Sequence, residues 1–408
     1  MEATAMVVPR RASTVREVWA SPLYLGATMA MFLSGLGTSA AAPQIVLYLV
    51  KELGASLPVA GLYYLTTLVG PVAGYLVGSY SDRTGIRLNL FRLCALAGFV
   101  GWAGVALSTA IWMPFVISAI VLAFSGAAVS QIFAAVHDEQ VASPSRSNEG
   151  VVAIIRMALT AGWIVGPVLG AWLGAVLGLR AMLWATAICF LVQILPLGTL
   201  GATAPANTTA GGTDTAPPGR PGLVELLPLL AFTGLFVLVY AGDSIKYGFL
   251  LIYMEDQLHI EPAVRGAVIG IQPFVELCIM PFSVILGHRI GIIWLMCIAA
   301  ALGVIANLLF ATSGSVFGML AAQILMGGVW GVFMVLGILG AQRLVPSAVA
   351  TASAIFLSSS ALSSALGGVA GGIGVATLGL PSVFFIPAAC SLLAVVGLTA
   401  MARKHNFH

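Results

Sequence analysis

Long apolar runs separated by short polar segments make up most of the chain. A helix needs about 20 mainly apolar residues to cross a bilayer. Twelve runs reach that length, near residues 22–50, 58–80, 88–109, 112–136, 150–177, 180–200, 223–253, 262–287, 291–312, 315–341, 349–377 and 381–402. The strands of a membrane β-barrel would instead alternate in polarity over about 10 residues. The pattern therefore predicts an all-α membrane protein with twelve transmembrane helices.

A polar gap divides the runs into two groups of six. Residues 201–222 read GATAPANTTAGGTDTAPPGRPG, a composition that cannot form a packed core. We predict a linker there, between an N-terminal bundle at 1–200 and a C-terminal bundle at 223–408. The second run ends in Asp82-Arg83-Thr84-Gly85, and the eighth ends in His288-Arg289-Ile290-Gly291 at the corresponding place. This short repeat favours two related halves.

Composition agrees with a membrane protein. Hydrophobic residues make up 60% of the 408 residues and charged residues 8%, whereas soluble domains carry about 25% charged residues. The net charge of +3 is scattered, so no basic patch points to nucleic acid. All five cysteines lie inside apolar runs and are interpreted as packing residues. We expect no metal and no cofactor.

Orientation follows from the basic residues, which favour the cytoplasmic side. If both termini are cytoplasmic, only Lys51, Arg180 and Arg265 fall in outer loops, and most other Lys and Arg residues lie inside. The sequence therefore predicts a multi-pass protein with cytoplasmic termini and a cytoplasmic linker. The Ala- and Gly-rich composition favours a bacterial source, and hence the inner membrane.

The densest charged segment between two runs spans residues 78–87. Asp82, Arg83 and Arg87 can form an ionic network at the membrane surface. Gly78 permits close helix contact, and Gly85 permits the positive φ of a tight turn. The segment resembles the signature G-x-x-x-D-R-x-G-x-R between the second and third helices of the major facilitator superfamily, with every fixed position matched. The alternative interpretation is an ordinary basic turn.

Four charged residues stand inside predicted spans, where charge is costly unless it is paired or hydrated. Glu276 lies near mid-membrane in the eighth run, where a carboxyl group suits proton binding and release. Its structural alternative is an ion pair with Arg156, which can also reach the inner surface or hold a substrate group. Asp243 and Lys246 share a helix face toward the outer end of the seventh run. They either neutralise each other in an outer vestibule or bind substrate.

Uncharged polar residues are the next candidates for a binding site. Amides both donate and accept hydrogen bonds, so a cavity that they line suits a polyhydroxyl solute. The candidates are Gln131, Gln272, Asn307 and Gln323, and Trp163 can stack against the apolar face of a sugar. The alternative is that such amides join neighbouring helices.

The fifth run contains small residues at every fourth position. Gly162, Gly166 and Gly170 permit close approach of another helix, and Pro167 removes a backbone hydrogen bond. The pattern G-x-x-x-G-P-x-x-G resembles the antiporter motif of exporters in the same superfamily, so it favours efflux. A similar glycine cluster at residues 367–372 indicates a close contact or hinge in the eleventh run.

Several short segments together resemble the SET family of bacterial sugar efflux transporters. They are Ala41-Ala42-Pro43, Gln131-Ile132-Phe133-Ala134, Arg156 ahead of Gly162-Trp163-Ile164-Val165-Gly166-Pro167, Gly270 followed by Glu276, and Gln323 with Gln342. The resemblance implies proton-driven efflux of sugars or glucosides, with Arg156 and Glu276 as site residues. Asp243 and the long linker depart from the expected pattern.

These observations predict a monomeric secondary transporter with two six-helix bundles around a central cavity, whose partners are a small-molecule substrate, protons and the lipid bilayer. Asp82, Arg83 and Arg87 are expected to hold the cytoplasmic side closed when the cavity faces outward. The alternatives are a multidrug/proton antiporter and, from another class, a non-transporting membrane sensor. An enzyme is not expected, because no Walker loop, Gly-x-Ser-x-Gly or His-Glu-x-x-His motif occurs. Residues 137–139 are interpreted as a solvated helix end.

Overall fold

The structure is a computed structural model that describes residues 14–143, 148–198, 200 and 223–404. Twelve helical spans in this part of the chain are long and apolar enough to cross a membrane. The prediction of an all-α membrane protein with twelve transmembrane helices is confirmed. The predicted linker at 201–222 lies outside the described residues, so the proposed domain boundaries stay a prediction.

The N-terminal half contains helices α1 to α11. They are α1 (Thr14–Ala20), α2 (Pro22–Ala41), α3 (Ile45–Lys51), α4 (Leu57–Gly61), the 3₁₀ segment η1 (Leu62–Val69), α5 (Gly70–Thr84), α6 (Arg87–Ala106), α7 (Trp112–Ile117), the π segment η2 (Ser118–Leu122), α8 (Ala123–Ser125), α9 (Ala127–Ala142), α10 (Asn148–Val176), α11 (Leu179–Val192) and η3 (Leu195–Leu197).

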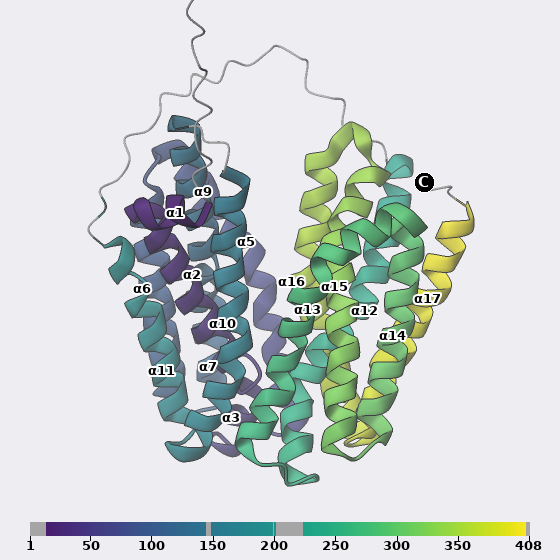
Figure 1. Ribbon diagram of the computed structural model, residues 1–408. Helices are drawn as coiled ribbons and strands as arrows, with labels where there is room; N and C mark the ends of the chain where they lie inside the picture. The colour runs from purple at the N-terminus through teal and green to yellow at the C-terminus, as the bar shows by residue number, and fades with distance from the viewer. Residues whose placement is uncertain (1–13, 144–147, 199, 201–222, 405–408) are drawn as a thin grey trace, which may run out of the picture.

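The C-terminal half uses longer, less interrupted helices. They are α12 (Leu223–Asp256), α13 (Pro262–Ile290), α14 (Ile292–Thr312), α15 (Val316–Leu344), η4 (Pro346–Ala348), α16 (Val349–Leu378), η5 (Ser382–Phe384) and α17 (Phe385–Lys404). The purple-to-teal helices form one bundle and the green-to-yellow helices, with teal α12, form the other (Figure 1).

The second span is broken where the apolar pattern predicted a continuous helix. It runs through α4, then the 3₁₀ segment η1, and then α5, which begins at Gly70. A stretch of 3₁₀ helix in the middle of a span often marks a hinge. Gly70 and Pro71 stand at the junction, where proline has no N–H to donate. The fourth span is likewise interrupted, by the π segment η2.

Glycines set the close packing inside each half. A Cβ on Gly162 of α10 would lie 2.4 Å from the Phe32 carbonyl oxygen of α2, so the two backbones touch. In the other half, a Cβ on Gly367 of α16 would lie 2.1 Å from the Ala241 carbonyl oxygen of α12. The fifth span thus packs on the first as the eleventh packs on the seventh. The predicted close contacts at both glycine clusters are confirmed.

Two further glycine contacts join the halves. Gly266 and Gly270 of α13 pack against the backbone of α10, and Gly368 and Gly372 of α16 pack against α4. Near the same end of the molecule, Lys51 of α3 forms an ion pair of 2.5 Å with Asp256 of α12. The bundles approach each other most closely toward this end, the lower one in Figure 1. We name it the closed end, and the end that carries Thr84 and Lys404 the terminal end.

Candidate functional site

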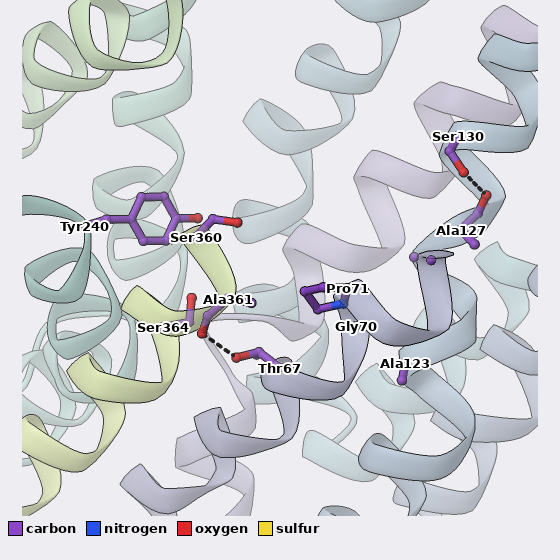
Figure 2. A pocket seen from close by; sticks show the side chains of 12 residues that line it. Thr67, Gly70, Pro71, Ala123, Ala127, Ser130, Tyr240, Ser360, Ala361 and Ser364 are labelled. Carbon is purple, nitrogen blue, oxygen red and sulfur yellow. Dashed lines mark hydrogen bonds between the residues drawn. The ribbon is translucent and has the colours of Figure 1, made fainter. Parts of the chain in front are cut away.

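A cavity of about 450 Å³ lies between the two bundles. The N-terminal half contributes Thr67, Gly70, Pro71, Gly74, Ala123, Gly126, Ala127 and Ser130, and the C-terminal half contributes Tyr240, Ser360, Ala361 and Ser364. Figure 2 shows Tyr240 and the α16 serines on one side, facing Thr67 and Pro71 across the space. The predicted central cavity is therefore present. We name it the central cavity.

A second cavity of about 500 Å³ extends into the N-terminal bundle. It shares Thr67, Gly70, Ala123 and Gly126 with the central cavity, so the two adjoin. Its other walls are Ser34, Thr38, Ala42, Ile45, Tyr63, Tyr64, Thr66, Trp102, Ser118, Leu122, Ser125, Val129, Leu159, Trp163 and Phe190. The described residues that line this cavity carry no charge; they are aromatic and aliphatic side chains with several hydroxyls. We name it the aromatic cavity.

The 3₁₀ segment η1 supplies polar groups to both cavities that sequence reasoning missed. Tyr63 and Ser118 share a buried hydrogen bond of 2.6 Å, and Thr67 donates to the Ala361 carbonyl oxygen at 3.2 Å. The second bond crosses between the halves and is drawn in Figure 2. The signal was present as Tyr63-Tyr64-Leu65-Thr66-Thr67, a cluster of hydroxyls within an otherwise apolar run.

Trp163 lines the aromatic cavity, as its predicted stacking role requires. Arg156 stands seven residues earlier on α10, which is about two helical turns and hence on the same face. Its side chain is exposed and makes no ion pair or hydrogen bond with any residue that the structure describes. Arg156 thus lies on the helix that carries the cavity tryptophan, but it lines neither the central nor the aromatic cavity.

Glu276 occupies the middle of α13, as predicted. Because α13 runs antiparallel to α10, with Gly270 beside Ile164, continuing that register places Glu276 near the level of Arg156. The carboxylate is partly buried and within electrostatic range of Arg156, Asp243 and Lys246. It makes no hydrogen bond and no ion pair within 4.0 Å among the described residues. The alternative of a direct Arg156–Glu276 ion pair is therefore not realised in this conformation.

Asp243 and Lys246 are buried side chains of α12. Lys246 is ten residues from the end of α12 at Asp256, about 15 Å at 1.5 Å per residue. Its side chain is 0% exposed and that of Asp243 is 11% exposed. Both residues lie nearer the Asp256 end of the span Glu225–Asp256 and form an ion pair with each other, as predicted. They are buried and line neither cavity, so the vestibule around them is not observed.

Four side chains from three helices surround this buried charge, and we name them the Lys246 cluster: Asp243, Lys246, Gln272 and Trp330. The Lys246 ammonium donates to Asp243 Oδ1 and to Gln272 Oε1. Trp330 Nε1 donates to the same Asp243 oxygen at 3.1 Å. Gln272 thus belongs to an interhelical network and lines neither cavity.

The signature loop at 78–87 forms the predicted ionic network in part: Asp82 and Arg87 pair, Arg83 does not join them, and Asp138 is a partner that the sequence did not indicate. Arg87 donates to Asp82 at 2.6 Å and to Asp138 of α9 at 3.1 Å. It also donates to Ser81 Oγ at 2.8 Å, and Ser81 donates to the buried Gln131. Gln131 is therefore part of this network and not a wall of either cavity.

Of the remaining predictions for this loop, the one for Gly85 is confirmed and the one for Gly78 is not. Gly85 has φ 69°, so the predicted positive φ is confirmed, and its repeat partner Gly291 has φ 92°. Gly78 has nothing within 4 Å of a Cβ position, so the predicted close contact is absent here. Gly70, Gly74 and Gly78 are four residues apart on α5, and the first two line the central cavity, so Gly78 faces the same separation between the bundles. Arg83 is exposed and makes no ion pair with the described residues.

We expect Asp138→Asn to loosen the loop, because Arg87 then loses one of its two carboxylate partners. The free energy of unfolding should fall by about 0.5–1 kcal/mol, since the pair is partly exposed to solvent. Thermal unfolding of the purified protein measures this change. The neighbouring Glu139→Gln, which removes a carboxylate that forms no described ion pair, should leave the unfolding midpoint unchanged; equal effects of both variants would contradict the assigned role.

Two other predicted site residues lie away from the cavities. Asn307 is buried on α14, and its amide nitrogen donates to the Gly303 carbonyl oxygen of the same helix. Gln323 is buried on α15, and neither of its amide atoms has a partner among the described residues. Both stand within the C-terminal bundle and line neither cavity. The structure therefore does not bring them to the candidate site.

A metal site finds no support in the described part of the chain. No group of three or more His, Cys, Asp or Glu side chains there is placed to hold an ion. Within residues 137–139, Asp138 pairs with Arg87.

This chain is similar in sequence to a family of known transporters. The family model of the Major Facilitator Superfamily matches residues 27–242. A Deinococcus radiodurans protein, named as a candidate sugar efflux transporter, is 26% identical over 91% of this chain and 96% of its own length. Sugar efflux transporter A of Dickeya chrysanthemi is 25% identical over 84% of this chain and 86% of its own.

A solved structure supports the fold. The nucleoside transporter NupG superimposes with a TM-score of 0.76 at 18% identity, over 93% of this chain and 98% of its own. The family match covers more than half of the chain and includes the signature loop, the antiporter motif and the broken second span. The chain belongs to the major facilitator superfamily.

Proposed function

We propose that the protein is a secondary transporter that exports sugars or glycosides in exchange for protons by alternating access. The proposal rests on the uncharged aromatic cavity, which is lined by hydroxyls and by Trp163. Trp163 belongs to α10, the helix that also carries the unpaired Arg156. The names of the relatives reported above, sugar efflux transporters, support the same substrate class and a transporter instead of an enzyme.

The walls of the aromatic cavity fit a sugar chemically. A sugar ring has apolar C–H faces, which stack on aromatic rings such as Trp163 and Trp102. Its edge carries hydroxyls, which exchange hydrogen bonds with side chains such as Ser118 and Thr66. The two adjoining cavities, of about 450 and 500 Å³, fall within the usual size of small-molecule sites, about 300–1,000 Å³.

Glu276 is the proposed proton carrier. It is an intramembrane carboxyl without a fixed partner among the described residues, and it stands near the level of Arg156 on the contact between the halves. A group in that position can reach each side of the membrane in turn as the bundles rock. Arg156 then holds the substrate or the unprotonated carboxylate, depending on the step.

Orientation and assembly belong to the proposal. We place the terminal end in the bacterial cytoplasm because the loops there carry the basic residues. The conformation described above is then closed toward the outside by the glycine contacts and by Lys51–Asp256. Among the described residues, the signature loop forms ion pairs within its own half only, which fits a cytoplasmic side that is not locked. We expect a monomer.

Multidrug export predicts a different ligand class. It predicts a mostly aromatic and apolar cavity that binds lipophilic cations, and the aromatic cavity has largely apolar walls, with hydroxyls and no acid among them. Binding measurements therefore decide between the two ligand classes. The test is thermal unfolding of the purified protein with sugars, glycosides or cationic dyes. A ligand at about 100 times its Kd stabilises the fold by about 2.7 kcal/mol. We expect glycosides or sugars to stabilise the protein; stabilisation by dyes alone would favour drug export.

Trp163→Ala tests whether the aromatic cavity is the site of that binding. Loss of the stacking surface should weaken binding of the stabilising ligand about tenfold, equivalent to 1.4 kcal/mol. Trp172→Ala removes a ring from the same helix that is exposed and lines neither cavity, so it should leave affinity unchanged. Titration of the ligand by thermal shift measures both; equal affinities in the two variants would move the site elsewhere.

A further inference from the structure

The ammonium of Lys246 is the most enclosed charge that the structure describes inside the membrane-spanning region. Burying a charge is tolerated only with good partners. Lys246 has three: it donates to Asp243 and Gln272, and its ammonium lies 4.4 Å from the ring centroid of Tyr247. Asp243 is therefore its one carboxylate partner in this conformation.

A second carboxylate lies within reach. Gln272 and Glu276 are four residues apart on α13, so their side chains are neighbours, with Cβ atoms about 5–6 Å apart. Lys246 is bonded to the Gln272 side chain, one helical turn from Glu276. Lysine carries its charge on a flexible four-carbon stem. Lys246 also interacts electrostatically with Glu276, so the exchange proposed below is a change of Lys246 rotamer from Asp243 toward Glu276.

Resting on the proton-coupled function proposed above, we propose that Lys246 couples proton binding to transport by exchanging between Asp243 and Glu276. When Glu276 carries a proton it needs no counterion, and Lys246 pairs with Asp243, as seen here. When Glu276 loses its proton to water on the open side, the new carboxylate competes for Lys246. The proton on Glu276 moves between that carboxyl and water, and Lys246 itself stays protonated throughout.

The surroundings of Asp243 make the exchange feasible. Trp330 donates to the same Asp243 oxygen as Lys246, so a hydrogen bond remains when the lysine leaves. The other titratable groups that face this region are Tyr240 and Tyr247 of α12, Tyr64 of η1 and Arg156 of α10. The tyrosines are neutral, so the charges on Asp243, Glu276 and Arg156 chiefly determine which carboxylate Lys246 pairs with.

Tyr64 connects this exchange to the aromatic cavity. The residue lines that cavity, and its buried hydroxyl has no hydrogen-bond partner among the described residues. It lies within electrostatic range of Asp243 in the opposite half. When Lys246 leaves Asp243, the Tyr64 hydroxyl is placed to respond to the uncovered carboxylate. Proton loss at Glu276 is thereby felt at the wall of the cavity.

The test is the double variant Asp243→Asn, Lys246→Met in liposomes. Removing both charges avoids the unpaired buried charge of a single variant, and neutral replacement of a buried pair is often tolerated. We measure sugar flux with and without a pH gradient. The ratio of gradient-driven to gradient-independent flux should fall about 5- to 150-fold, the range of typical coupling between two sites.

The matched control is Glu255→Gln, Arg265→Gln. It neutralises another ion pair that involves α12, in this case between Glu255 of α12 and Arg265 of α13 near the closed end. Its flux ratio should equal that of the parent. A parent-like ratio in the Asp243→Asn, Lys246→Met variant would overturn the proposal, because Lys246 would then serve only to neutralise Asp243.

A third variant separates this proposal from the proposed function. Asp243→Asn alone leaves Lys246 with Glu276 as its one carboxylate, so the exchange is lost and the ratio should also fall. If the parent protein shows no proton-driven sugar flux, the proposed function fails. If a pH gradient drives sugar flux equally in the parent and in Asp243→Asn, only the proposed exchange of Lys246 fails.

Discussion

Glu276→Gln is expected to remove the response of transport to a pH gradient. Glutamine has nearly the shape of glutamate, but its amide binds no proton in the working range, so the ratio of flux with a gradient to flux without one should fall to about one. The reason is positional: Glu276 lies mid-helix on α13, without a hydrogen bond or ion pair among the described residues. Sugar flux from liposomes, with and without the gradient, measures the ratio.

The matched control for that experiment is Glu225→Gln. Glu225 also carries a carboxylate, but it is exposed in the first turn of α12. Its removal should leave the flux ratio unchanged. If Glu276→Gln responds to the gradient as the parent does, Glu276 is not the proton carrier. Arg156 and Glu276 could then serve only as substrate ligands.

Gly162→Ala is expected to cause the second large effect, on stability. A Cβ there would lie 2.4 Å from the Phe32 carbonyl oxygen and 2.5 Å from the Leu36 amide nitrogen, both backbone atoms that cannot rotate away. The helices α2 and α10 would have to separate. Overpacking of this kind typically costs about 1–3 kcal/mol, so the free energy of unfolding should fall by that amount.

Thermal or denaturant unfolding in detergent measures the loss. Gly234→Ala on α12 is the control, because nothing lies within 4 Å of its Cβ position. Alanine is also the better helix former, so the control should be neutral or slightly stabilising. If both variants unfold at the same midpoint as the parent, α2 and α10 are not held by backbone contact at Gly162.

The twelve spans and the signature loop were predictable because each depends on local composition. A bilayer requires about 20 apolar residues of every helix, and Gly85 must adopt positive φ to end α5. The resemblance to sugar efflux transporters, and with it Arg156 and Glu276, rested on short motifs for the same reason. Span composition and short motifs each lie within one segment of the chain, so they can be recognised without knowing how the segments pack.

The site itself was predicted only in part. Trp163, Arg156 and Glu276 were chosen because aromatic and charged side chains in a membrane stand out individually; of the three, only Trp163 lines a described cavity. Asn307 and Gln323 stand out equally, yet they face the interior of the C-terminal bundle. The polarity of a residue does not indicate which side of its helix will face a cavity. The periodic spacing of apolar residues does not indicate it either, because in a membrane helix every face is largely apolar.

Sequence alone determined the membrane class, the twelve helices and the turn at Gly85 that ends α5, because hydrophobic length and glycine conformation are local quantities. Only the tertiary structure decided that the second span breaks at η1, that Asp138 anchors Arg87 and that Lys246 lies between Asp243 and the turn that carries Glu276. Those facts depend on how helices far apart in the chain pack, and backbone contacts at glycines such as Gly162 and Gly270 set that packing.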